Sequence, residues 1–376
     1  MNIPKLRFKE FTDEWTLQYF NKFLIERNII ANEKLNLYSL TIEKGIIPKN
    51  EQYEREFLIN KIDEAYKEIQ KNDFVYNPMN IRFGAVGRFK KGIHAKVSKY
   101  YNVFYCNNNL NNIFFEFLIK TKKLLNLYNK LAIGSLNEKK RLHYSDFLKI
   151  KYYMPSLQEQ EKIANFLATV DEKIINLENT ITSLENQKKG LLQQIFSQKL
   201  RFKDKNSNNY PNWEKKKLGD ILKICHGKDY KNEPNEKKLY PVLGTGGIIT
   251  YIDNFLCNWK CVLIGRKGTI NKPQYMETPF WSVDTLFYSK PKTKQNPKFQ
   301  YYLFQNINWI KYDESTGVPS LSASTIENIS FVLPCLEEQT KIADFLSAFD
   351  RKLDNQKAQL EHWKQIKKGL LQQMFV

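Results

Sequence analysis

Basic side chains next to glycines are the residues of this sequence that could do recognition chemistry. A glycine lets the backbone of a turn come close to a phosphate, and the long cations of arginine and lysine reach phosphate oxygens or guanine edges. Such turns are predicted in "RFGAVGRFKKG" and "GRKGTINK". The candidate residues are Arg82, Arg88, Lys90 and Lys91 in the first stretch and Arg266, Lys267 and Lys272 in the second. A solvated surface turn is the alternative for either stretch.

Two polar segments, each ending at a proline, carry further hydrogen-bond donors. They read "RLHYSDFLKIKYYMP" and "STGVPSLSASTIENISFVLP". Arg141, Ser320 and Ser322 in these segments could contact phosphates or bases through guanidinium or hydroxyl hydrogen bonds. The alternative for the serines is structural, because "SAST" could simply cap the turn before "IENI".

The net charge supports a polyanionic partner. Lysine and arginine outnumber aspartate and glutamate by 59 to 40, which gives a formal charge of +19. An excess of this size attracts polyanions whatever the fold, so nucleic acid is the leading partner class. A protein that is merely rich in lysine is the alternative. The length of 376 residues and the aromatic share of 14% predict a globular chain with two domains.

No catalytic motif is recognisable in the sequence. The P-loop pattern GxxxxGK[ST] is absent, and "GTGGII" at Gly244 lacks the last glycine of a dinucleotide-binding loop. "NPMN" at Asn77 is not the Asn/Asp-Pro-Pro-aromatic motif of amino-methyltransferases, and the four histidines stand in no recognisable constellation. We therefore expect a reader of nucleic acid without a catalytic site or a cofactor of its own.

The cysteines and the N-terminus bear on the cellular compartment. The five cysteines are odd in number and scattered, which favours reduced thiols over a disulfide framework. "CNWKC" and "CH" could together supply four zinc ligands, but their spacing fits no ribbon or finger, so no metal site is predicted. "MNIPKLRFKEF" has no apolar signal region, and no window reaches the roughly 18 to 20 apolar residues of a membrane span. These features predict a soluble cytoplasmic protein.

The chain contains an internal duplication. Aligned without a gap, residues 154–197 and 333–376 share 20 of 44 positions, including "EQ", "KIA" and "KKGLLQQ". The segment "KLRF" at Lys5 recurs at Lys199. The globular segments between these repeats, about 16–153 and 214–332, barely resemble each other, and each predicts a small mixed α/β domain.

Apolar residues in each long repeat follow alternating steps of four and three, which is the a/d pattern of a coiled coil. The predicted seam comprises Ile163, Leu167, Val170, Ile174, Leu177, Ile181 and Leu184 in the first repeat, and Ile342, Leu346, Phe349, Leu353, Leu360 and Trp363 in the second. Gln356 and the matched Lys188 and Lys367 interrupt it. A helix from Ile163 to Ile195 would be about 48 Å long. Two such helices predict an antiparallel pair with one head at each end. The alternative is that each helix packs only on its own domain.

The predicted fold is therefore α/β. It consists of two small mixed α/β DNA-recognition domains separated by an antiparallel coiled coil of two long helices, with a pseudo-two-fold internal repeat. The predicted segments are a first recognition domain at 1–153, a spacer helix at 154–198, a second recognition domain at 199–332 and a second spacer helix at 333–376.

This arrangement resembles the specificity subunit of Type I restriction-modification enzymes. The likeness rests on "LRF…DEW", the helix starts "P…EQ.KIA.FL", the helix ends "KKGLLQQ(I/M)F", and "GRKGTI…FWSVDTLFY". In the first head, "GRFKKGI" matches the last of these only in part. The resemblance implies two target recognition domains that each read one half of a split double-stranded DNA sequence.

The resemblance also implies partners. Two modification (methyltransferase) subunits, which bind S-adenosylmethionine, would dock on the helices, and restriction subunits, which use ATP and Mg²⁺, would join the complex. Two other functions stay open at this point. One is a non-catalytic basic coiled-coil scaffold that binds RNA or DNA without sequence specificity. The other is a stand-alone nuclease or methyltransferase of unfamiliar type.

Overall fold

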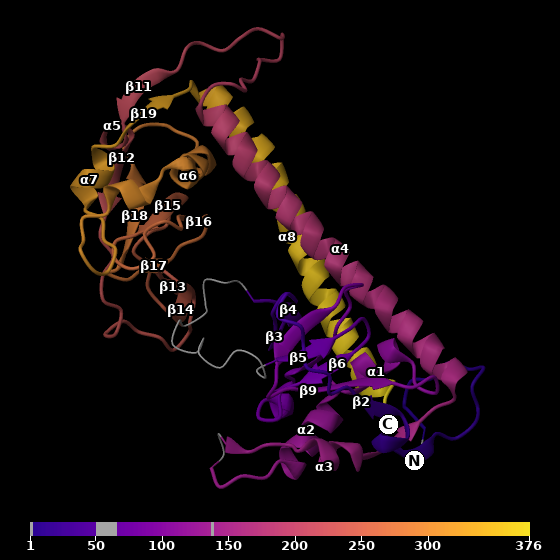
Figure 1. The fold of residues 1–376 in the computed structure, drawn as a ribbon. Coiled ribbons are helices and arrows are strands. Elements are labelled where there is room, and N and C mark those ends of the chain that lie inside the picture. Colours follow the sequence, from indigo (N-terminus) through magenta and orange to yellow (C-terminus); the bar gives the residue numbers. More distant parts are fainter. Residues whose placement is uncertain (1–2, 50–65, 137–138) are drawn as a thin grey trace. The chain divides into compact units, whose positions relative to one another are not determined.

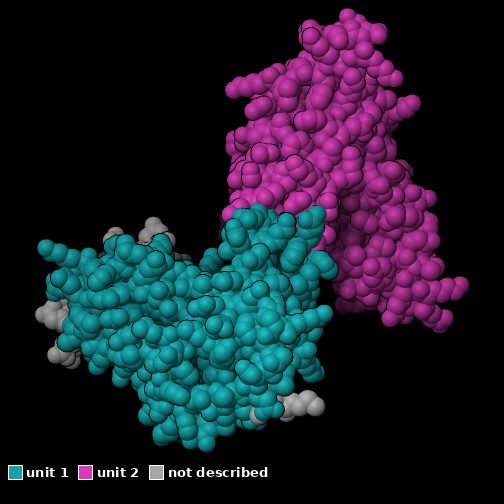
Figure 2. All heavy atoms as spheres, turned by 90° about the vertical axis from the view of Figure 1, so that its right-hand side faces the viewer, with its two compact units in different colours: residues 1–178, 359–376 teal, residues 179–358 magenta. Residues whose placement is uncertain are grey.

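Two long helices run through the computed structural model, which describes residues 3–49, 66–136 and 139–376. Helix α4 spans Leu157–Phe196 and helix α8 spans Leu336–Gln373 (Figure 1). The chain divides into two compact units, residues 1–178 with 359–376 and residues 179–358 (Figure 2). Each long helix contributes to both units, so the units group the chain differently from the four predicted segments, whose boundaries stay a prediction.

The first unit contains a four-stranded antiparallel sheet of β2 (Leu24–Glu26), β9 (Asn102–Cys106), β6 (Phe74–Tyr76) and β7 (Val86–Arg88), in that order. Paired strands are β1 (Thr16–Tyr19) with β10 (Lys151–Met154), β3 (Tyr38–Thr41) with β4 (Gly45–Pro48), and β5 (Tyr66–Ile69) with β8 (Ala95–Ser98). The helices are α1 (Asn112–Leu118), α2 (Lys122–Leu131) and α3 (Tyr144–Leu148), with short 3-10 turns η1 (Phe20–Lys22) and η4 (Ile81–Phe83). A core rich in phenylalanine fills this unit and includes Ile163 and Leu167 of α4.

The second unit contains a four-stranded antiparallel sheet of β12 (Leu222–Cys225), β18 (Leu286–Pro291), β15 (Cys261–Gly265) and β16 (Gln274–Met276). Strands β14 (Gly247–Ile252), β13 (Tyr240–Gly244) and β17 (Trp281–Ser282) form a three-stranded sheet, and β11 (Glu214–Lys217) pairs with β19 (Ser330–Leu333). The helices are α5 (Leu218–Ile221), α6 (Pro297–Asn306) and α7 (Ala323–Glu327), with the 3-10 turn η6 (Trp309–Tyr312). The predicted mixed α/β class is confirmed for both units.

The two units share a frame of matching elements and one strand order in their four-stranded sheets, although the smaller sheets differ. In each unit the strand after the "KLRF" segment pairs antiparallel with the strand before the long helix: β1 with β10, and β11 with β19. Each bound of α7 and β19 lies 179 positions after the matching bound of α3 and β10. The duplication therefore extends into the segments that the sequence predicted to be dissimilar. It was hidden there because the frame depends on backbone pairing, which constrains side-chain identity only weakly.

In the first unit, the repeated "EQ" holds other segments to the start of α4. The Arg7 guanidinium donates to both carboxylate oxygens of Glu159, at 2.7 and 2.8 Å. The neighbouring Gln160 accepts the backbone N–H of Asn111 at 2.9 Å. Asn111 is in turn the N-cap of α1. We call these two contacts the helix-start clasp.

The second unit repeats the clasp at the start of α8. The Arg201 guanidinium donates to both carboxylate oxygens of Glu338, at 2.7 and 2.9 Å. Gln339 accepts the backbone N–H of Asn296, the N-cap of α6, at 3.0 Å. The indole of Trp213 adds a hydrogen bond to Glu338 at 2.9 Å. The repeats "KLRF" and "EQ" are thus two sides of one contact.

Within the first unit, α4 and α8 are joined by ion pairs. Lys367 Nζ lies 2.5 Å from Asp171 Oδ1, and Lys364 Nζ lies 2.8 Å from Glu178 Oε1. The partner positions rise along α4 as they fall along α8, so the helices run antiparallel. Lys367 also lies over the ring of Phe117 of α1, with its ammonium 5.5 Å from the ring centroid.

The second unit repeats this arrangement. Lys188 Nζ lies 2.5 Å from Asp350 Oδ1, and its ammonium is 5.3 Å from the ring centroid of Tyr302 in α6. The Tyr302 hydroxyl donates to the other carboxylate oxygen of Asp350 at 2.6 Å. The two lysines that interrupt the predicted seam are therefore matched ion-pair residues. The predicted antiparallel coiled coil is confirmed.

Burial along the seam differs between the two helices. On α4 all seven predicted seam residues are buried, whereas on α8 Phe349, Leu360 and Trp363 are half-buried. Ile163 and Leu167 belong to the core of the first unit, and Ile342 and Leu346 belong to the core of the second. The ends of the seam thus pack on the units as well as within the coil.

Replacing Leu177 by Glu should destabilise the coil. The Leu177 side chain is only 5% exposed, and a carboxylate placed there has no partner, which costs several kcal/mol. We expect the midpoint of thermal unfolding, followed by circular dichroism, to fall by several degrees. Ile175→Glu is the matched control, because Ile175 lies on the same helix and is 55% exposed. Equal midpoints for the two variants would contradict the assignment of Leu177 to the seam.

Candidate nucleic-acid interface

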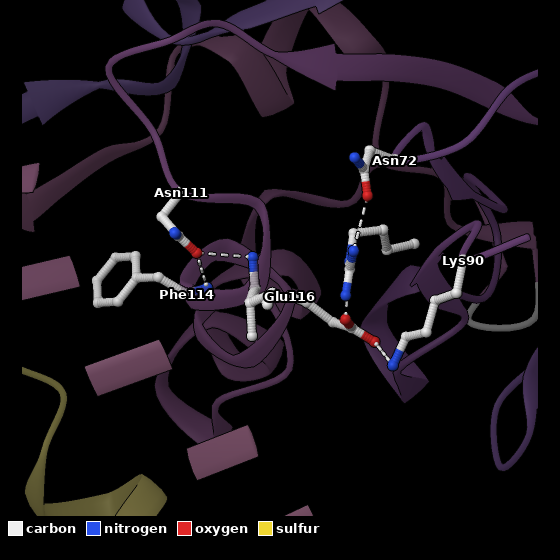
Figure 3. A network of polar contacts seen from close by, with 7 residues as sticks. Asn72, Lys90, Asn111, Phe114 and Glu116 are labelled. Atoms are coloured by element: carbon white, nitrogen blue, oxygen red, sulfur yellow. Dashed lines mark hydrogen bonds and ion pairs between the residues drawn. The ribbon is translucent and has the colours of Figure 1, made fainter. Parts of the chain in front are cut away.

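The first basic turn is tied into the structure through Arg88. Its guanidinium donates to Glu116 at 2.9 Å and to the Asn72 side-chain oxygen at 2.7 Å (Figure 3). Lys90 reaches the other carboxylate oxygen of Glu116 at 2.8 Å. The Arg88 side chain is 13% exposed and that of Lys90 is 61% exposed. Arg88 therefore joins β7 to α1, and Lys90 keeps access to solvent.

The structure brings three of the predicted residues together in this region. Arg88, Lys90 and Lys91 line one cavity of about 360 Å³, which Lys120 also lines. Burial lowers the pKa of Lys120 because the charged form loses solvation. The cavity is therefore rich in ammonium groups. Arg82 does not line it.

Arg82 and Arg141 lie at other places of the first unit. The Arg82 guanidinium covers the exposed ring of Phe83, 4.4 Å from its centroid. Arg141 is exposed and lines a different cavity, of about 530 Å³, together with aromatic side chains that include Tyr100 and Tyr144. Sequence reasoning missed both tyrosines. For Tyr100, the pair "YY" at residues 100 and 101 was an available signal.

In the second unit, the two predicted segments lie side by side. Lys267 and Ser320 form a β-bridge, and the backbone N–H of Gly268 donates to Pro319 O at 2.8 Å. Gly268 has a φ of +83°, which favours glycine, and a Cβ on Gly265 would clash with Thr269 O. The glycines of "GRKG" are thus required by the tight loop itself.

The cations of this loop differ in how far their side chains are exposed to solvent. Lys267 is exposed, whereas Arg266 is half-buried and donates to Asp284 O at 3.4 Å. Lys272 is exposed and lies further along the same loop. The structure therefore groups Arg266, Lys267 and Ser320, and the predicted DNA contacts of all these residues stay predictions.

Ser322 has a structural role. Its hydroxyl oxygen accepts the backbone N–H of Thr325 at 3.1 Å, so Ser322 is the N-cap of α7, as the alternative interpretation of "SAST" predicted. The same hydroxyl donates to Glu314 at 2.9 Å, and Thr325 donates to that carboxylate as well. These hydrogen bonds, that of Thr325 first, lower the pKa of Glu314.

Asp313 organises the loop that presents Ser320. Its carboxylate accepts the backbone N–H of Ser320 at 2.9 Å and both the N–H and hydroxyl of Ser315. These hydrogen bonds, that of Ser320 first, lower the pKa of Asp313. Sequence reasoning did not identify Asp313, because an aspartate in a polar loop gives no sign of which amides it binds.

The cysteines are free thiols. Cys257 and Cys261 are buried together with their sulfurs 3.7 Å apart. Among the described residues, no group of three or more His, Cys, Asp or Glu side chains is placed to hold a metal ion. None of the described helices combines the length and apolarity that a bilayer span requires.

Residues 210–362 match the model of a family described as "Type I restriction modification DNA specificity domain". Curated relatives include the Type I restriction enzyme MjaVIII specificity subunit of Methanocaldococcus jannaschii, 25% identical over 60% of this chain and 61% of that protein. Another is the putative type I specificity subunit S.MpnORF89P of Mycoplasma pneumoniae, 25% identical over 64% of this chain and 73% of that protein. The chain thus spans less than two thirds of the length of the first of these.

The fold has a solved counterpart. The crystal structure of a Type I restriction-modification S subunit from M. genitalium superposes with a TM-score of 0.66 and 18% identity, covering 100% of this chain and 99% of that one. The chain is thus similar to Type I specificity subunits over residues 210–362, and its fold matches that of a solved S subunit. The resemblance predicted from the sequence is confirmed.

The family match distinguishes the two units. The specificity-domain model covers Arg266, Lys267, Lys272, Ser320 and Ser322 and ends at residue 362, so it includes the second unit's candidate residues and none of the first unit's. For the first unit, the structural match over the whole chain shows the fold alone.

Arg88→Met should destabilise the first unit, because it leaves the Glu116 carboxylate with Lys90 alone and removes the bond to Asn72. We expect faster amide hydrogen exchange in β7 and α1. Lys91→Met is the control, because Lys91 is exposed and has no hydrogen bond or ion pair among the described residues. Unchanged exchange in Arg88→Met would show that Arg88 does not join these elements. Arg88 would then be a cation that is free to contact DNA.

Proposed function

We propose that this chain is the DNA sequence-specificity subunit of a Type I restriction-modification complex. It reads a bipartite double-stranded DNA target, with one half-site for each unit, and docks two modification subunits through its long helices. The observation that carries this proposal is the duplicated frame. The strand pair, the short helix, the helix-start clasp and the strand order of the four-stranded sheet occur in both units, while the smaller sheets beside them differ.

Equal frames and unequal sheets suit different tasks. Two copies of the same partner need two equal docking surfaces, which a repeated helix and clasp can supply. Two different half-sites need two different sets of side chains, which unlike sheets and loops can supply. The chain contributes recognition alone. The modification subunits bind S-adenosylmethionine, and the restriction subunits use ATP and Mg²⁺.

The charge supports DNA as the ligand. A net charge of +19 provides the salt-dependent attraction to phosphates on which specific base contacts are added. Lys267 and Lys272 in the second unit, and Lys90, Lys91 and Arg141 in the first, are the exposed predicted contacts. A scaffold without sequence specificity would share this charge, so the test must measure sequence.

Sequencing of methylated adenines in cells that express this chain with its modification subunit tests the proposal. We expect one motif with two specified halves and an unspecified centre. Exchanging residues 214–332 for the matching segment of another specificity subunit should change one half and leave the other half intact, because each unit reads its own half-site. A single continuous motif, or methylation without a motif, would contradict the proposal.

Residues 1–198 expressed alone should form an antiparallel homodimer. This fragment lacks Lys367, the partner of Asp171, but Lys188 stands at the matching position of the repeat, so a second copy can supply it. With the modification subunit, a symmetric dimer should methylate an inverted repeat of one half-site. Sedimentation velocity checks the dimer and methylation sequencing checks the motif. A monomer, or an asymmetric motif, would contradict the pseudo-symmetric interpretation.

A further inference from the structure

One cavity of the first unit combines aromatic, amide and basic side chains. It has a volume of about 530 Å³, within the range of small-molecule sites. It is lined by Asn77, Tyr100, Tyr101, Arg141, His143 and Tyr144, among others. These residues come from three separate stretches of sequence. Only Arg141 of this set was predicted to contact DNA.

Backbone hydrogen bonds hold the walls of this cavity in place. Arg141 exchanges two hydrogen bonds with Ile133, at 2.9 and 3.0 Å, and the N–H of Leu142 donates to Pro78 O at 2.9 Å. The turn that carries Tyr100 and Tyr101 is closed by a bond from Tyr101 N–H to Ser98 O at 3.0 Å. The Arg141 and Tyr100 side chains therefore extend from fixed backbone.

A buried hydroxyl at this cavity has no protein partner. The Tyr144 side chain lines the cavity, and its hydroxyl oxygen is buried without a hydrogen bond to any described residue. A buried polar group left in this state costs about 1–3 kcal/mol, and because its oxygen is shielded, Tyr144 forms part of the cavity wall without offering an accessible hydroxyl. Burial raises the pKa of Tyr144 above its usual range, which keeps the hydroxyl protonated.

The other side chains fit a nucleobase. The Tyr100 side chain is 75% exposed at the cavity, and aromatic faces stack bases of any sequence. The side-chain amide of Asn77 can hydrogen-bond a base edge. The exposed guanidinium of Arg141 can bind a neighbouring phosphate or a guanine edge.

The repeat places this cavity at the same position as the basic loop of the second unit. The offset of 179 that relates α3 to α7 also relates Arg141 to Ser320. Ser320 is the residue that pairs with Lys267 of the "GRKG" loop. In both units, predicted contact residues therefore gather at the segment that leads into the short helix. In the first unit this segment lies at the cavity lined by Tyr100, Arg141 and Tyr144, which we call the tyrosine cavity. The "GRFKKGI" turn is instead tied to Glu116 through Arg88.

We propose that the tyrosine cavity of the first unit binds one nucleobase of the DNA target and determines the specificity of the first half-site. Tyr100 stacks on the base, Asn77 hydrogen-bonds its edge, and Arg141 contacts an adjoining phosphate or guanine. This inference rests on the proposed function, because it assumes that the first unit reads DNA.

The test uses the full chain with its modification subunit and compares variants by methylation sequencing. Tyr100→Ala and Arg141→Ala should relax or abolish the specified bases of one half-site and leave the other half unchanged. Tyr251→Ala is the matched control, because Tyr251 is exposed in the second unit. Tyr144→Phe keeps the ring and removes a buried hydroxyl that has no partner, so it should not lower the unfolding midpoint.

Binding measurements complete the test. With a labelled duplex that carries the methylation motif, we expect the Kd of Tyr100→Ala and Arg141→Ala to rise about tenfold relative to the control variant. If the unaltered protein yields no bipartite motif, the proposed function fails. If it yields one, but motif and Kd are unchanged in Tyr100→Ala and Arg141→Ala, only the tyrosine cavity is overturned.

Calorimetric titration of the full chain with dAMP, dGMP, dCMP and TMP separates DNA from free nucleotide as the source of the base. Tight saturable binding of one mononucleotide that Tyr100→Ala abolishes, together with an unchanged methylation motif, would assign the cavity to a free nucleotide and overturn its role in DNA reading. Binding weaker than millimolar agrees with a base that is held as part of DNA.

Discussion

The buried carboxylate at the start of each long helix is the contact on which the architecture depends. Glu338 is completely buried and Glu159 is 1% exposed, and each is neutralised by the fork of one arginine. Removing one partner of such a pair leaves a buried charge and costs about 3–5 kcal/mol. Because the arginine belongs to the distant "KLRF" segment, this contact closes each unit onto its long helix. "KLRF" and "EQ" occur together in both repeats because each buried glutamate needs an arginine to neutralise it.

Two half-buried ion pairs fix the register of the coil. A sliding coil would keep its apolar a/d contacts after a shift of one heptad, but Lys188 would then lose Asp350 and the Tyr302 ring, and Lys367 would lose Asp171 and the Phe117 ring. Lysines at seam positions therefore exchange some apolar burial for a single alignment of the two helices. In a specificity subunit that alignment would set the length of the unread spacer.

The sequence was sufficient for the coil and the mixed α/β class, since a period of 3.5 sustained over a long repeat is a local signal. It was insufficient for the side-chain partners of the candidate residues. Arg88 looks like a free cation in "GRFKKG", but Glu116, 28 positions away, binds it. Ser322 looks like a hydrogen-bond donor to a phosphate, but its side chain caps α7. The tyrosine cavity draws on residues 77, 100 and 141, which no spacing rule connects.

The shared frame explains why the two units carry different candidate surfaces at matching positions. Backbone pairing and buried charge hold β1 with β10, and β11 with β19, at matching positions, and neither contact uses the side chains of the sheets between them. Those sheets can therefore differ in sequence while the four-stranded sheets keep one strand order along the chain, β2-β9-β6-β7 in the first unit and β12-β18-β15-β16 in the second. The segment before α3 or α7 leads directly into the matching short helix of each unit. Its position is therefore fixed, while the loops around it vary. A tyrosine cavity beside Arg141 and a basic loop beside Ser320 are two surfaces that the same frame presents.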